Sequence, residues 1–132
     1  MMRSTRRGGV LIRAEAQLYF VPASVAVRIA PPPRVTPVPG APPGLLGIAL
    51  HAGSVVPVMT IGPERAEMVV CLEAGELVGV VGGRVVRTGT FDVVTHRPEV
   101  VEHEGEQALP LDVHALCAAV HPGARSGAAA SR

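Results

Sequence analysis

Histidine and glutamate side chains of the kind that bind metal ions gather near one predicted hairpin toward the C-terminus. His96 and His103 lie there with Glu102, Glu104 and Glu106, and imidazole and carboxylate groups are common zinc ligands. The alternation of side chains along a strand, however, sends Glu102 and His103 to opposite faces, and neither an HxH nor an HExxH spacing occurs. The pattern therefore favours a solvent-exposed hairpin, and we predict no metal site.

Residue types that could support catalysis are few and lie far apart in the sequence. His51, Ser54 and Asp92 could be drawn as a triad, but triads are recognised by geometry and no spacing brings Asp92 to the other two. The glycine-rich segment 79–83 is not followed by the Lys-Ser/Thr of a phosphate-binding loop and does not begin a helix. We therefore predict no catalytic residue, no cofactor and no enzymatic activity.

Length and composition narrow the class of protein. The chain has 132 residues, 48% hydrophobic and 17% charged, with a net charge of +1. This near-neutral balance argues against a basic nucleic-acid binder or a membrane-surface protein. Valine is the most frequent residue and aromatic residues make up 2%, which favours strands. The composition therefore predicts one compact, mainly β domain.

The cysteines and the N-terminus bear on the compartment. Cys71 and Cys117 lie far apart with no CxxC spacing, so we expect buried thiols in a reducing cytoplasm and no disulfide framework. The apolar run that follows the N-terminal arginines is cut short by Arg13 and Glu15, so it does not form a signal-peptide core. We predict a cytoplasmic protein without direct membrane insertion.

Short apolar runs separated by turn residues predict most of the secondary structure. Segment 24–29 is compatible with a strand or a short helix, whereas the proline-rich segment 31–43 must be extended or turning, because proline has no N–H to donate. Strands with turns at this spacing are typical of small barrels or sandwiches. The predicted strands are 10–15, 17–21, 45–50, 55–61, 68–72, 77–81, 85–86, 91–94, 100–103 and 106–109.

One helix is predicted near the C-terminus. Asp112 is a favourable N-cap, and Pro122 with Gly123 would end the helix. The apolar positions have helical spacing: Val113, Leu116, Cys117 and Val120.

Several sequence blocks resemble the CheW-like domain, the module of bacterial chemotaxis coupling proteins that recurs in CheA kinases. The resemblance covers nearly the whole chain and rests on VTPVPGAP at 35–42, LGI at 46–48 and GSVVPV at 53–58, with QLYFVP at 17–22, LVGVV at 77–81 and LPLD at 109–112. It implies two five-stranded SH3-like barrels packed face to face, with a C-terminal helix. We accordingly expect a single domain over residues 10–122, with flexible tails at 1–9 and 123–132.

The same resemblance implies a function without chemistry. The protein would be an adaptor that joins chemoreceptor cytoplasmic tips to a CheA-type histidine kinase. The alternative is a degenerate domain of the same fold that binds another partner, because the Asn-Leu-Arg-Gly of the family turn is Leu50-His51-Ala52-Gly53 here. Ala52 thus replaces the arginine that the family uses for partner contact.

The candidate partner-binding residues lie in two neighbouring segments. The proline-rich crossover is preorganised, which lowers the ordering cost of binding, and the turn at 51–54 is expected to be exposed. Val38, Leu46, Ile48, Val56 and Val58 could instead fill a barrel core. The predicted contact residues are Thr36, Val38, Pro39, Leu46, His51, Ala52, Gly53 and Ser54.

Overall fold

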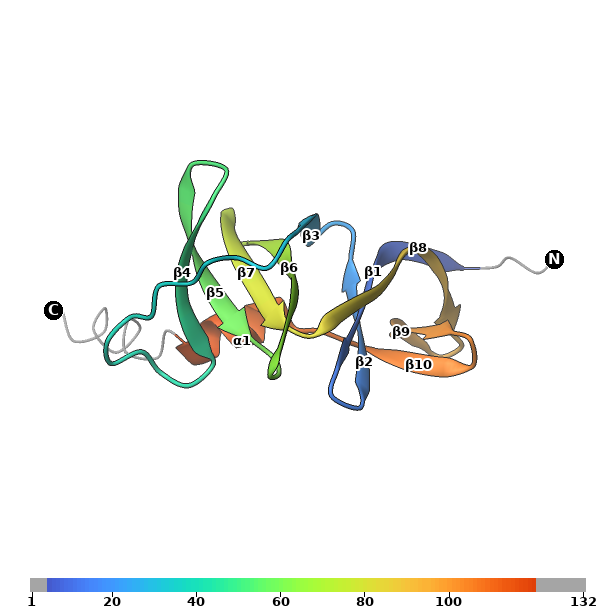
Figure 1. Cartoon of the computed structure of the whole chain (residues 1–132). Helices are drawn as coiled ribbons and strands as arrows, with labels where there is room; N and C mark the ends of the chain where they lie inside the picture. Colours follow the sequence, from blue (N-terminus) through green and yellow to red (C-terminus); the bar gives the residue numbers. More distant parts are fainter. Residues whose placement is uncertain (1–4, 121–132) are drawn as a thin grey trace, which may run out of the picture.

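Ten strands and one helix in the described part of the chain form two five-stranded units that lie side by side (Figure 1). The computed structural model describes residues 5–120. The elements are β1 (Arg6–Ala14), β2 (Gln17–Pro22), β3 (Ala26–Ala30), β4 (Leu45–His51), β5 (Ser54–Thr60), β6 (Glu64–Glu73), β7 (Glu76–Gly82), β8 (Arg84–Val94), β9 (Arg97–His103), β10 (Glu106–Pro110) and α1 (Val113–Val120).

The first unit is a closed barrel with the strand order β1-β2-β10-β9-β8. It combines both ends of the chain, because β10 pairs in parallel with β2 and β8 pairs antiparallel with β1. Phe20 and Phe91 meet edge to face in its interior, with ring centroids 6.2 Å apart. The interior side chains are Leu11, Leu18, Phe20, Phe91, Val101 and Ala108.

The second unit is a five-stranded sheet with the order β3-β6-β7-β5-β4, so β3 and β4 are its edges. Segment 31–44 crosses from β3 to β4 and pairs with β4 at one point, between Thr36 and Ile48. Because seven prolines of this segment lack an N–H group, it cannot form a longer ladder. The inner face of the sheet is lined by Ala30, Ala49, Val56, Val58, Met68, Val70 and Val81.

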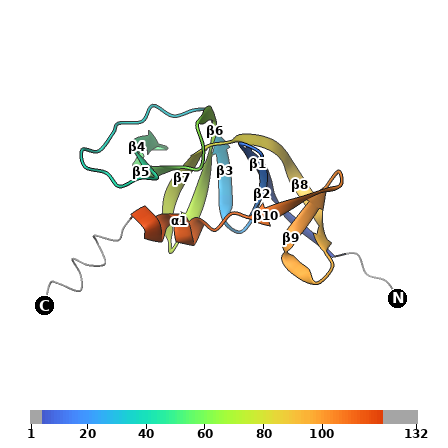
Figure 2. The ribbon, with the colours of Figure 1, turned by 90° about the horizontal axis from the view of Figure 1, so that it is seen from below.

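A third apolar cluster joins the two units. Alternation along β1 sends Leu11 into the barrel and its neighbours Val10 and Ile12 toward the second unit. There they meet Val69 and Cys71 of β6. Helix α1 covers this cluster with Val113, Val120 and the partly buried Leu116 and Cys117. For most of its length the crossover lies on the side of the second sheet away from α1 (Figure 2).

The mainly β fold with a C-terminal helix is confirmed. In the ambiguous segment 24–29, residues from Ala26 onward form strand β3, whereas Ser24 and Val25 lie in the turn before it. The N-cap is also confirmed, since Asp112 Oδ1 accepts a hydrogen bond of 2.9 Å from the Ala115 N–H. The strands predicted at 85–86 and 91–94 are parts of one long strand, β8, because the residues between them pair with β1.

The ordered strand begins earlier than the domain boundary placed at Val10. Residues 6–9 pair with β8, and Arg6 Nε lies 3.6 Å from Asp92 Oδ1, so this part of the expected tail belongs to the barrel. The predicted C-terminal tail at 123–132 and the helix stop at Pro122 and Gly123 lie outside the described residues. Within residues 5–120 the structure contains no helix of the length and apolarity needed to span a membrane.

Candidate functional site

The hairpin turn predicted at 51–54 is present, and the strands extend into it, so that two residues, Ala52 and Gly53, connect β4 to β5. His51 pairs with Ser54, and the turn residues Ala52 and Gly53 both have positive φ, 50° and 83°. Two-residue hairpin loops need this conformation to match the strand twist. An alanine in the left-handed region costs about 1–2 kcal/mol, so the flanking strands must hold the turn in place. His51 is half-buried, whereas Ala52, Gly53 and Ser54 are exposed.

Strand alternation divides the side chains near this turn between two faces. Ala49 and Val56 are buried on the inner face of the sheet. Leu50 and Val55, which lie directly opposite each other, point outward with 72% and 64% of their surface exposed. They are the most exposed large apolar residues of the described chain. Their exposure was not predicted from the sequence. It follows from strand alternation, because Leu50 and Val55 are the immediate neighbours of the buried Ala49 and Val56.

The crossover is attached to β4 next to this pair. The backbone N–H of Thr36 donates to Ile48 O at 2.8 Å, and the N–H of Ile48 donates to Thr36 O at 2.9 Å. Gly47 permits the approach, because a Cβ there would lie 2.2 Å from Thr36 O. Val38 and Pro39 are exposed farther along the crossover, whereas Leu46 is half-buried against the inner apolar cluster.

Two hollows flank the hairpin. The outer groove has a volume of about 310 Å³ and lies between the crossover and the β4–β5 hairpin. The turn socket, of about 120 Å³, lies between the edge strand β3 and the turn. The outer groove is lined by Arg34, Thr36, Ile48, Ala49, Leu50 and Val55, and the turn socket by Val27, Arg28, His51, Ala52, Val70 and Leu77.

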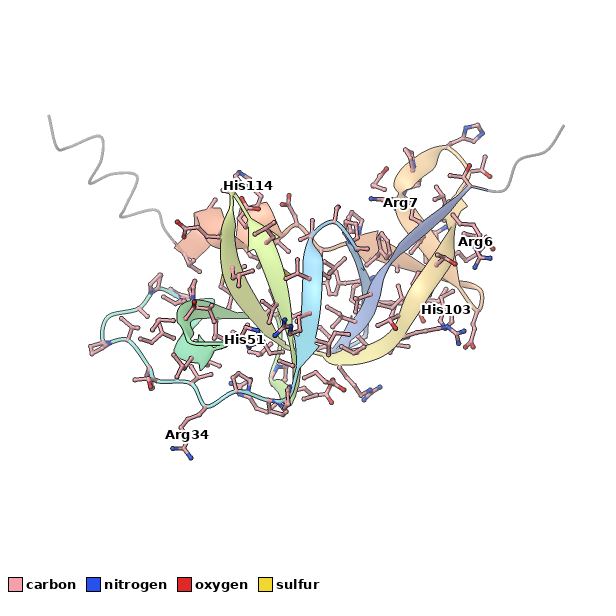
Figure 3. All side chains as sticks on the ribbon, turned by 90° about the horizontal axis from the view of Figure 1, so that it is seen from above. Arg6, Arg7, Arg34, His51, His103 and His114 are labelled. Atoms are coloured by element: carbon pink, nitrogen blue, oxygen red, sulfur yellow. The ribbon has the colours of Figure 1, made fainter. Side chains whose placement is uncertain are left out.

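The charged side chains that line the two hollows are positive. Arg34 lines the outer groove and Arg28 the turn socket, and no acidic residue lines either one. Across residues 5–120, neither arginine takes part in an ion pair. Arg34 extends from the crossover away from the body of the molecule, and His51 lies apart from it nearer the sheet (Figure 3). The hairpin thus combines apolar and cationic surface.

A third hollow, the inter-unit groove, lies where the two units meet the start of α1 and has a volume of about 270 Å³. His114 Nδ1 of α1 lies 2.5 Å from Glu73 Oε2 at the end of β6. This contact joins α1 to β6 on one side of the groove. The groove is lined by Arg7, Pro22, Val25, Glu73, Glu99, Pro110, Leu111, Asp112, Val113 and His114.

In the described part of the chain, the residues considered above do not gather as a metal site or a triad, although His103 Nε2 lies 3.7 Å from Glu104 Oε2. His103 packs on the Phe91 ring, with centroids 5.6 Å apart, and Glu102 lies opposite Asp92 on the adjacent strand. Asp92 therefore lies in the first unit, away from His51 and Ser54 in the second. Within the described residues no three His, Cys, Asp or Glu side chains gather in a metal-binding arrangement.

The structure brings together only part of the predicted contact set. Thr36 lies in the outer groove, while His51 and Ala52 lie in the turn socket. Val38 and Pro39 line neither hollow, and Leu46 contributes mainly to the core. The structure adds three residues of the outer groove to the predicted set: Arg34, Leu50 and Val55.

Comparison with known proteins gives one family and one fold. The sequence profile of the CheW-like domain matches residues 8–107. Among solved structures, the chain is similar to the scaffolding protein TtCheW from Thermoanaerobacter tengcongensis, at 14% identity, with a TM-score of 0.71 and coverage of 85% of this chain and 92% of that one. At this identity the similarity concerns the fold. No curated protein sequence matches the chain.

Proposed function

Because the chain belongs to the CheW-like domain family, we propose that it is a non-enzymatic adaptor of bacterial chemotaxis-type signal transduction. In this proposal it joins the cytoplasmic tip of a chemoreceptor to a CheA-type histidine kinase. The cytoplasmic location expected from the sequence is part of the proposal.

The observation that carries the proposal is the presence of two separate surfaces on one small fold. An adaptor must bind two partners at once, and the β4–β5 hairpin and the inter-unit groove are formed by different residues. The exposed apolar hairpin suits a folded partner domain, so we assign it to the kinase. The inter-unit groove suits a helical segment, so we assign it to the receptor.

The contact residues predicted from the sequence remain part of this proposal, but the support for them differs with their position relative to the hollows. Thr36, His51 and Ala52 line the hollows beside the hairpin and are the strongest members of the set. Gly53 and Ser54 are exposed at the turn itself. Val38, Pro39 and Leu46 lie outside these hollows.

A second candidate is supported by one residue. Ala52 leaves the turn tip without the arginine that the resemblance associates with partner contact. The alternative is therefore a CheW-like module that binds a different protein through the same hairpin.

The two candidates are separated by titrating the purified chain with the kinase's own CheW-like domain and, separately, with a chemoreceptor cytoplasmic hairpin. The adaptor proposal predicts saturable binding to each. Binding to neither would contradict it and leave the alternative partner.

A further inference from the structure

We propose that the outer groove binds a segment of the kinase in which an apolar side chain lies next to a carboxylate, and that Arg34 recognises the carboxylate. The inference rests on the proposed function, and it adds the chemistry of the partner segment and a specificity residue. It is argued from three observations: an exposed apolar pair, an arginine in a groove lined by no acidic residue, and a backbone bridge that holds the chain two residues after that arginine.

The apolar pair indicates where the partner's apolar side chain lies. Leu50 and Val55 are neighbours on adjacent strands and form one patch on the outward face of the hairpin. Val55 is β-branched and both residues belong to paired strands, so little side-chain and backbone freedom remains to be lost on binding. Burial of such a patch is the usual apolar contribution to an interface.

The charge indicates what must lie next to that side chain. The outer groove holds Arg34 and no acidic residue, and across residues 5–120 Arg34 makes no ion pair. The guanidinium group is a fork of donors that matches a carboxylate. A partner with a carboxylate beside its apolar residue is therefore complementary to the groove, and a partner with a lysine there is repelled.

The position of Arg34 is set by the backbone on either side of it. Pro33 precedes it and has a fixed φ, and Thr36, two residues later, is hydrogen-bonded to Ile48 of β4. Gly47 allows this close approach. The backbone at Arg34 is thus held beside the groove before a partner arrives, which lowers the backbone entropy lost on binding.

The neutral turn adds to the argument. Ala52 and its neighbours Gly53 and Ser54 carry no charge, so within the outer groove the positive charge comes from the crossover. Arg34 supplies the positive charge of the outer groove, and Arg28 supplies that of the turn socket. At the outer groove, the electrostatic part of partner choice therefore falls to Arg34.

The test compares two matched pairs of variants in titrations with the kinase's CheW-like domain. Arg34→Glu is matched by Arg65→Glu, since Arg65 is exposed at the start of β6 and, among residues 5–120, bonds only to nearby backbone carbonyls. Val55→Thr is matched by Val86→Thr, an exposed valine of β8 outside the groove. Thermal melting of each variant verifies folding, and Leu50→Thr is a second probe of the patch.

We expect Arg34→Glu and Val55→Thr each to weaken the complex about tenfold, and the two matched controls to change it by less than about twofold. Added salt should weaken the wild-type complex and affect the Arg34→Glu complex less. If Arg34→Glu binds the kinase domain as tightly as Arg65→Glu, the inference is wrong and the adaptor function stands. If the wild-type chain does not bind the kinase domain, both are wrong.

Discussion

Thr36 and Ile48 exchange two backbone hydrogen bonds, of 2.8 and 2.9 Å, and these bonds hold the proline-rich crossover against the edge strand β4. They form the one bridge between this segment and β4 within the described chain. Because Arg34 lies two residues before Thr36, the same bridge positions the proposed recognition residue. Stability and partner binding are therefore linked at this point of the fold.

Replacement of Gly47 by alanine should loosen this bridge. A Cβ at this position would lie 2.2 Å from Thr36 O, against backbone that cannot move without losing its hydrogen bonds. We expect Gly47→Ala to lower the free energy of unfolding by about 1–3 kcal/mol, measured by chemical denaturation. Gly8→Ala is the matched control, because its nearest contact would be 3.7 Å away. Equal stability of the two variants would show that the crossover does not depend on Gly47.

The ion pair between Arg13 and Glu106 should make stability depend on pH. Arg13 donates to both carboxylate oxygens at 3.0 and 2.6 Å. This hydrogen bonding lowers the pKa of Glu106 below its ordinary value of 4.5. The lowered pKa means that the stabilisation is complete above pH 4.5 and is lost as the pH falls through the folded-state value.

Glu106→Gln should therefore be less stable than the wild type at neutral pH, and the difference should shrink in acid. Denaturant titrations across that pH range measure it. Glu76→Gln, at an exposed position without an ion pair among residues 5–120, is the control. A stability difference that is the same at every pH would argue against the ion pair.

The Cys71 thiol should be unreactive in the folded protein. Burial raises its pKa to about 12, and the nearby Cys117 adds to the effect, so the nucleophilic thiolate is scarce at neutral pH. We expect an alkylating reagent to modify Cys71 only after unfolding, as read by mass spectrometry of the two cysteine peptides. Rapid modification under native conditions would show that β6 is less protected than its burial indicates.

A negative charge at His51 should weaken partner binding without unfolding the protein. His51 lines the turn socket beside Arg28, and a glutamate there would repel an acidic partner and offset the local positive charge. His51→Glu should reduce affinity for the kinase domain about tenfold, with a change in stability of less than about 0.5 kcal/mol. A large fall in the thermal midpoint would instead give His51 a structural role.

The sequence is sufficient to predict most elements of the fold. Short apolar runs of leucine, isoleucine and valine predict β4 and β5. The N-cap Asp112 and the helical spacing of the apolar residues after it predict α1. The length of β8 could not be predicted, because Arg87, Thr88 and Gly89 carry no strand pattern and are ordered by pairing with β1. Tertiary pairing overrides local propensity there.

The candidate site is only partly visible in the sequence. The turn at 51–54 is predicted by its composition, whereas the importance of Arg34 depends on a contact between segments that only the folded chain reveals. Leu46 illustrates the opposite case, since its place in a predicted contact motif does not show that it packs against the inner cluster. Exposure depends on register and closure of the sheet, which short motifs do not specify.

The most direct test of the adaptor function is a three-component binding measurement. A chemoreceptor cytoplasmic hairpin is immobilised, the kinase's CheW-like domain is supplied in solution, and the amount of kinase domain retained is measured with and without the present protein. The account predicts that adding the protein increases the retained kinase domain, and that Arg34→Glu reduces this increase while Arg65→Glu does not. If the protein leaves the retained amount unchanged or lowers it, it does not couple the two partners and the account is contradicted.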